Sequence, residues 1–135
     1  MSTDGRLVVL AVLGSTLVLG ACAGEDADLA GRTFTATEVQ GHELVEGSSV
    51  TLTFDENAIS AQVGCNTLFG DASWDGDTLD VQEPMASTLM ACEEALMAQD
   101  QWLASFLTSS PALEADGDAV TLGDDTTSMT LTEQT

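Results

Sequence analysis

Residues 50–63 read VTLTFDENAISAQV, and this stretch indicates the fold class. Apolar residues alternate with Thr over 50–54 and with Ser and Gln over 59–63, which is the period of a strand with one buried face. The tripeptide Asp55-Glu56-Asn57 between the two runs has the composition of a turn. We therefore expect a β-hairpin here, with one face in the core.

Short runs of the same kind flank this hairpin on both sides and are separated by turn signals. The turns are rich in Asp and Gly, as in Asp116-Gly117-Asp118, which is typical of tight hairpins. The additional strands that we expect lie at 33–39, 68–74, 78–81, 112–113, 120–122 and 129–131. Most of the chain is therefore predicted to form short strands.

One segment, residues 91–107, breaks this pattern because it contains no Gly or Pro. The side chains that recur there at the spacing of one helical face are Cys92, Leu96, Gln99, Leu103 and Phe106. Gln99 is a polar interruption of that face. Several strands, one helix and further strands predict an α+β fold, in which one long helix covers a curled, mainly antiparallel sheet.

The N-terminal residues are of a different kind. An uncharged apolar run over 7–19 follows Arg6, which is the layout of a signal peptide. As a helix this run would rise about 20 Å, which is too short for a bilayer core of roughly 30 Å. The alternatives are a core helix at the N-terminus or a plain secretory signal.

Leu19-Gly20-Ala21-Cys22, at the end of this run, resembles the lipobox of bacterial lipoproteins. The resemblance implies that the signal is cleaved before Cys22 and that the thiol of Cys22 carries diacylglycerol. We therefore expect a signal peptide over 1–21, an acidic tether over 22–28 and one domain over 29–135.

The chain has three cysteines, Cys22, Cys65 and Cys92, and an odd number leaves one over in an exported protein. If Cys22 is lipidated, the other two remain in an oxidising compartment, where a disulfide can persist. Such a bridge would close a loop of about 27 residues and contribute roughly 3.5 kcal/mol in the chain-entropy treatment.

The charge is strongly negative. The sequence has 23 acidic residues, two arginines and no lysine, and its formal net charge is −21. Nucleic acid is excluded as a partner because almost nothing can neutralise its phosphates. Anionic headgroups would also repel the chain, so the lipid on Cys22 must hold it at the membrane. We interpret the acidity as a solubility feature rather than as cation binding.

Two short motifs stand out, Gly64-Cys65-Asn66-Thr67-Leu68-Phe69-Gly70 and Thr88-Leu89-Met90-Ala91-Cys92. Together they resemble the META domain family, which includes the HslJ-like heat-shock lipoproteins. The opening segment 29–34 is similar to that of the family, with Phe34 where the family has Trp. The last strands also fit, so the resemblance covers almost the whole chain after the tether.

The resemblance implies a small, cracked-barrel-like sheet with one long helix, and Cys65 and Cys92 match the two cysteines of the family. It also implies an envelope lipoprotein linked to heat stress and novobiocin resistance. The family has no established catalytic residues, so none is carried over. We expect Cys65 and Cys92 to form a structural disulfide, the alternative being a reactive thiol pair.

The other motif residues have structural interpretations. Gly64 and Gly70 would permit tight or bulged backbone at either end of the first motif. Asn66 would hydrogen-bond local backbone, as Asn does in turns. Thr88 begins the second motif.

Enzymatic and metal functions are the sharper alternatives. A hydrolase would need His42, the single histidine, as base for Cys65 or a serine, but no nucleophile motif is present. The turns at 75–77, 116–118 and 124–125 offer oxygen ligands for calcium without an EF-hand pattern. We expect no catalysis, no cofactor and no specific metal site.

A curled sheet with a helix across it can leave an apolar mouth for a ligand. Among the aromatic residues, which we assign mainly to the core, Trp74 and Trp102 are expected to be the most exposed. We therefore expect a non-catalytic, monomeric lipoprotein on the outer face of the cell membrane, with a role in envelope stress tolerance. The alternatives are a carrier or inhibitor module for a hydrophobic ligand or envelope protein, and a calcium-binding surface protein.

Overall fold

The structure is a computed structural model that describes residues 29–134. The predicted signal peptide, the tether and the lipidation site Cys22 lie outside the described residues. The described elements, in chain order, are β1 (Thr33–Ala36), β2 (Val50–Phe54), β3 (Ala58–Gln62), β4 (Thr67–Ser73), β5 (Asp80–Val81), β6 (Ala86–Ser87), α1 (Glu94–Leu107), β7 (Leu113–Asp116), β8 (Ala119–Gly123) and β9 (Ser128–Glu133).

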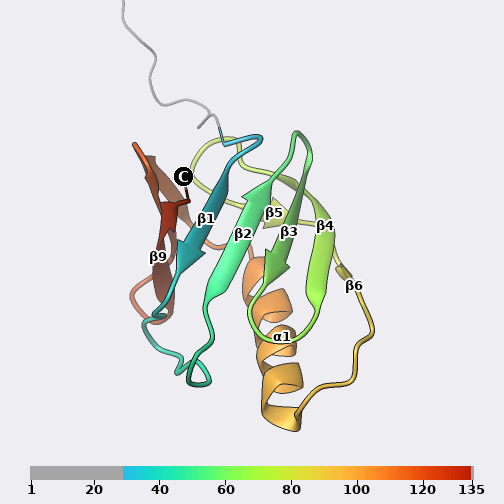
Figure 1. Cartoon of the computed structure of the whole chain (residues 1–135). Coiled ribbons are helices and arrows are strands. Elements are labelled where there is room, and N and C mark those ends of the chain that lie inside the picture. Colours follow the sequence, from blue (N-terminus) through green and yellow to red (C-terminus); the bar gives the residue numbers. More distant parts are fainter. Residues whose placement is uncertain (1–28, 135) are drawn as a thin grey trace, which may run out of the picture.

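The strands form one antiparallel sheet in the order β5-β4-β3-β2-β1-β9-β8-β7, and the short strand β6 pairs with β4. The sheet curls so far that β9 is turned away from the plane of β2, β3 and β4 (Figure 1). Its two ends meet at the starts of β5 and β7. There the N–H of Leu79 donates to the carbonyl of Pro111 at 2.9 Å, and the N–H of Leu113 donates to the carbonyl of Asp77 at 2.7 Å. This near-closure confirms the α+β class and the curled sheet.

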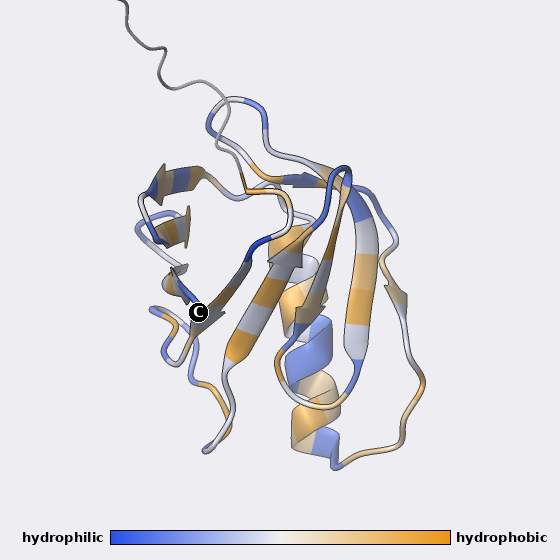
Figure 2. Cartoon of the chain, turned by 45° about the horizontal axis from the view of Figure 1, so that its top comes forward, coloured by the Kyte–Doolittle hydropathy of each residue, from blue (hydrophilic) through white to orange (hydrophobic). Residues whose placement is uncertain are grey.

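The predicted hairpin is β2–β3, and its register pairs Leu52 with Ala61 and Phe54 with Ile59. These four side chains are buried, while the residues between them are not, as the alternation requires. Figure 2 shows the same alternation along β2, where orange hydrophobic bands alternate with white bands of intermediate hydropathy. The hairpin therefore forms for the reason that its sequence indicates.

The core lies between the concave side of the sheet and α1, which crosses behind β2 and β3 in Figure 1. Phe54 stands edge-on to the rings of Phe34 and Trp74, with ring centroids 5.7 and 5.1 Å away. Trp74 is thus buried, and our expectation that it would be partly exposed was wrong. Trp102 is partly exposed, as expected.

The helix differs from its sequence prediction in its start and in its buried face. It begins at Glu94 rather than at residue 91. Its buried side chains are Gln99, Asp100, Leu103 and Leu107, whereas Phe106, which we assigned to the buried face, is only half-buried. The buried face therefore includes a carboxylate, Asp100, and is rotated relative to the predicted one.

The strand predictions differ from the structure most at β1, β5 and β6. Strand β1 ends at Ala36 because the chain turns at Gly41, where φ is +86° and Val39 bridges back to His42. Strand β5 has two residues rather than four. Strand β6 was not expected at all, because it is defined by pairing with β4 and not by a pattern of its own.

Candidate functional site

The two motifs meet at the N-terminal end of α1. Cys65, between β3 and β4, forms a disulfide with Cys92, two residues before the helix, and their Cα atoms are 6.1 Å apart. The predicted pairing is confirmed. The bond fixes the segment before α1 to the β3–β4 connection.

Asn66 links the same two segments through its amide. The side-chain oxygen of Asn66 accepts hydrogen bonds from the Thr88 hydroxyl at 2.9 Å and from the Met90 N–H at 2.7 Å. The Thr88 hydroxyl oxygen also accepts from the Thr67 N–H at 3.0 Å. Asn66 and Thr88 thus hold one motif against the other. Asn66 was expected to hydrogen-bond local backbone, but its side chain bonds the backbone of Met90, which is distant in sequence.

Asp100 on α1 is a site residue that the sequence analysis missed. Asp100 is 5% exposed, and its carboxylate accepts hydrogen bonds from the N–H groups of Cys65 and Asn66 at 3.2 and 2.9 Å. It also accepts from the side-chain amide of Asn66 at 3.2 Å. The residues joined in this way, which we call the motif cluster, are Cys65, Asn66, Thr88, Cys92 and Asp100.

Gln99, the polar interruption of the helical face, is buried, and both the oxygen and the NH2 group of its side chain are hydrogen-bonded. Its side-chain oxygen accepts from the Val45 N–H at 2.7 Å. Its NH2 group donates to the Ser48 hydroxyl at 3.0 Å and to the Val63 carbonyl at 2.9 Å. Gln99 therefore ties the β1–β2 loop and the end of β3 to α1.

The two motif glycines serve close packing rather than unusual backbone. A Cβ on Gly64 would lie 3.0 Å from the Leu96 carbonyl oxygen, so glycine allows α1 to approach the loop. Gly70 lies inside β4, opposite Ile59, where a Cβ would meet Val81 at 3.0 Å. Neither has a positive φ, and the tight or bulged backbone that we expected at Gly70 is wrong, because Gly70 pairs with Ile59 in the regular register of β4.

An apolar groove of about 450 Å³ opens beside the motif cluster, between α1 and the segment that runs from Met85 through β6 to Ala91. Leu89 is 94% exposed at its rim, and Met90 and Met97 are exposed to 59% and 38%. The lining residues are Asn66, Leu68, Met85, Ser87, Thr88, Leu89, Met90, Ala91, Met97, Asp100, Gln101 and Ala104. The two faces of the groove are thus connected through the motif cluster.

His42 and Cys65, the residues considered for catalysis, each have a different role in the structure. His42 stacks on Trp102 with ring centroids 3.9 Å apart, and Trp102 stacks in turn on Phe106. Cys65 is bonded to Cys92. The structure therefore assigns His42 to an aromatic stack and Cys65 to a disulfide.

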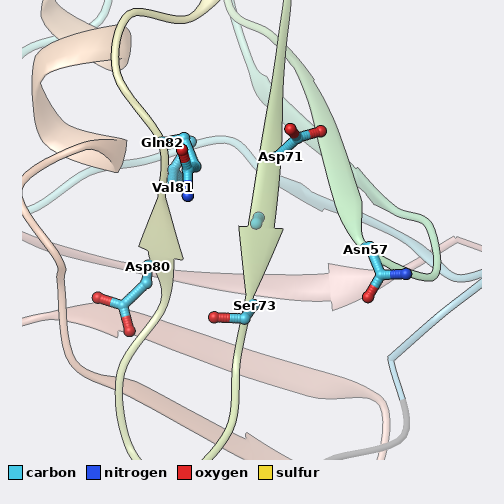
Figure 3. Close-up of a pocket in the computed structure, with 7 residues that line it drawn as sticks. Asn57, Asp71, Ser73, Asp80, Val81 and Gln82 are labelled. Atoms are coloured by element: carbon cyan, nitrogen blue, oxygen red, sulfur yellow. The ribbon is translucent and has the colours of Figure 1, made fainter.

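A second, more polar hollow lies beside β4 and β5 and carries two acids, Asp71 and Asp80 (Figure 3). Figure 3 shows their carboxylates pointing away from one another. Within residues 29–134, no three His, Cys, Asp or Glu side chains form a group that could hold a metal ion. Of the turns considered for calcium, Asp124 uses its carboxylate to accept from the N–H groups of Thr126 and Thr127.

Two carboxyl groups have a lowered pKa. Hydrogen bonds from the backbone of Thr127 and of Thr126 lower the pKa of Asp124. A hydrogen bond of 2.8 Å from the Arg32 guanidinium lowers the pKa of Glu133, and this ion pair joins β9 to the start of β1. Both groups lie far from the groove in sequence.

In the described part of the chain, no helix is both long and apolar enough to cross a membrane.

Comparisons with known proteins agree with this fold. A family model described as META domain matches residues 27–135. The comparison with curated proteins gave no match. One NMR structure is similar with a TM-score of 0.61 and 20% identity, over 77% of this chain and 90% of that chain. An NMR structure of a protein from Burkholderia xenovorans has a TM-score of 0.61 and 17% identity, over 91% of this chain and 99% of that chain.

Proposed function

The chain belongs to the META domain family, and on this premise we propose that it is a lipid-anchored, non-catalytic binding protein of the cell envelope. In this proposal the lipid on Cys22 holds the domain at the outer face of the membrane, and the apolar groove binds its ligand. Binding there contributes to envelope stress tolerance. The observation that carries the proposal is the groove.

The groove has the properties of a binding site. Single exposed apolar side chains are ordinary on a protein surface, but a contiguous apolar lining around a hollow is typical of a ligand or partner site. Leu89 and Met90 stand on a wall that the motif cluster fixes, while Met97 comes from the helix. Methionine is flexible and polarizable, which suits a site that accepts apolar groups of different shapes.

The proposal that the domain lies at the outer face of the membrane rests on the sequence pattern of the N-terminal residues. An apolar run followed by Leu19-Gly20-Ala21-Cys22 supports export and lipidation. Two or more acyl chains on Cys22 would hold a domain that its own acidity keeps away from anionic headgroups.

Mass spectrometry of the protein purified from host membranes tests the anchor. We expect a mature chain that begins at Cys22 and carries the added mass of the acyl chains. A Cys22→Ser variant should leave the membrane fraction. Recovery of wild-type protein that retains residues 1–21, or that has an unmodified Cys22, would contradict the anchor.

Titration with the neutral apolar dye Nile red tests the groove. Leu89→Ser and Met97→Ser should each weaken dye binding several-fold, because both side chains line the groove. Phe69→Ser is the matched control, since Phe69 is also an exposed apolar residue but lies outside the groove. Equal dye affinity in all three variants would reject the groove as the binding site.

A strain that lacks the gene tests the physiological role. We expect slower growth than wild type after heat stress, restored by the wild-type gene and not by the Leu89→Ser variant. Restoration by both genes would separate the stress role from the groove.

A further inference from the structure

The apolar groove contains a buried negative charge. Asp100 lines the groove, and its carboxylate accepts three hydrogen bonds, all from N–H groups of Cys65 and Asn66. Among residues 29–134, the ion pair that the structure shows is that of Arg32 with Glu133. Asp100 is therefore stabilised by neutral donors, and a buried carboxylate gains when a cation approaches it.

The helix face that borders the groove adds a second negative charge at its end. Glu93 lies one helical turn before Met97, on the same face as Met97 and Gln101. Its side chain makes no capping hydrogen bond to the helix. The groove thus offers apolar contacts from Met90 and Met97 beside the carboxylate of Asp100, and the helix that borders it begins directly after Glu93.

The segment that faces α1 across the groove includes a strand with an unpaired edge. Strand β6 pairs with β4 on one side, and among the described strands none pairs with its other edge. Residues 86–91, which continue from β6 along the groove, are all exposed. An extended peptide can add to such an edge through main-chain hydrogen bonds.

We propose that the groove binds an extended basic peptide segment of a partner protein, with apolar side chains between Met90 and Met97 and Lys or Arg side chains toward Asp100 and Glu93. This inference rests on the proposed binding function of the groove and names the partner class. Charge favours this occupant over the others. A second copy of the chain, with the same net charge of −21, or an anionic lipid surface would be repelled.

Fluorescence anisotropy on the purified full chain tests the peptide. The probe is a labelled heptapeptide of alternating Leu and Lys, and the matched control alternates Leu and Glu. We expect at least tenfold tighter binding of the Lys peptide, and weakening of that binding by added salt. Equal affinity for the two peptides, or tighter binding of the Glu peptide, would overturn the proposal.

Three variants locate the binding. Leu89→Ser and Glu93→Gln should each weaken the Lys peptide several-fold, and Phe69→Ser should leave it unchanged. Glu93→Gln removes a charge from an exposed side chain without a structural hydrogen bond, so it should fold normally. Unchanged affinity in Leu89→Ser and Glu93→Gln would mean that the peptide binds elsewhere, which overturns the proposal.

The dye titration separates the two levels of the account. Nile red binding that depends on Leu89, combined with no preference for the Lys peptide, would overturn the peptide inference and leave the groove function standing. If the dye binding did not depend on Leu89 and the Lys peptide were not preferred, both the groove function and the peptide inference would be rejected.

Discussion

The β2–β3 hairpin and the motif cluster are neighbours along the chain, yet they are held by different forces. In the hairpin, Leu52, Phe54 and Ile59 are buried against other apolar side chains. In the motif cluster, one covalent bond and hydrogen bonds to Asn66 and Asp100 hold the segments. Apolar burial is non-directional, whereas hydrogen bonds require fixed geometry. The difference indicates that the hairpin stabilises the fold and the cluster sets the shape of the groove.

The largest expected effect comes from the hairpin. Phe54→Ala removes a fully buried ring that contacts Phe34 and Trp74, so the free energy of unfolding should fall by about 3–5 kcal/mol. Urea denaturation measures the loss. The exposed Phe69→Ser is the control and should change little. A loss below about 1 kcal/mol for Phe54→Ala would show that this part of the core is not tightly packed.

Removal of the disulfide should have the next largest effect on stability. The double variant Cys65→Ser/Cys92→Ser frees a loop of 27 residues and should lose roughly 3.5 kcal/mol. Denaturation with and without reductant checks this, because reductant should destabilise the wild type and leave the double variant unaffected. Equal sensitivity of the two proteins to reductant would contradict the assignment of this bond as the structural one.

Asp100→Ala should cost less, about 1–3 kcal/mol, because it leaves the buried N–H group of Asn66 and the partly buried N–H group of Cys65 without an acceptor. Asp100→Asn keeps one acceptor oxygen and should lose less than Asp100→Ala. If the two variants were equally stable, hydrogen bonding to this carboxylate would not be what holds the cluster.

The smallest expected effect is on the far side of the sheet. The pKa of Glu133 is lowered by the hydrogen bond from Arg32, so its contribution to stability is present above its unfolded pKa and is lost as the pH falls through its folded pKa. The stability advantage of wild type over Glu133→Gln should therefore persist at about pH 6 and shrink below about pH 4. Melting temperatures of both proteins across this range measure it. An advantage that grew toward acid would reverse the sign of this argument.

The fold was largely predictable because its strands carry local signals. The period of two over 50–54 and the turn at 116–118 depend on neighbouring residues, and both are found where expected. Strand β6 was missed because Ala86 and Ser87 have no pattern of their own. Their extended form follows from pairing with Leu68 and Phe69, which is a non-local contact.

The candidate site was predictable in part. The paired cysteines and Asn66 were identified from the two motifs, whereas Asp100 was not, because it lies in neither motif. A signal was present in the spacing. Asp100 lies four residues after Leu96 and three before Leu103, so it shares their helical face. A charged residue at such a position indicates a buried polar role, and here its partners come from a distant loop.

The measurement that tests the central claim most directly is Nile red affinity of the Cys65→Ser/Cys92→Ser variant, made under conditions where circular dichroism shows that the sheet is folded. If the motif cluster shapes the groove, the affinity should fall several-fold relative to wild type, while the Phe69→Ser control retains it. Unchanged dye affinity in the folded double variant would contradict the claim.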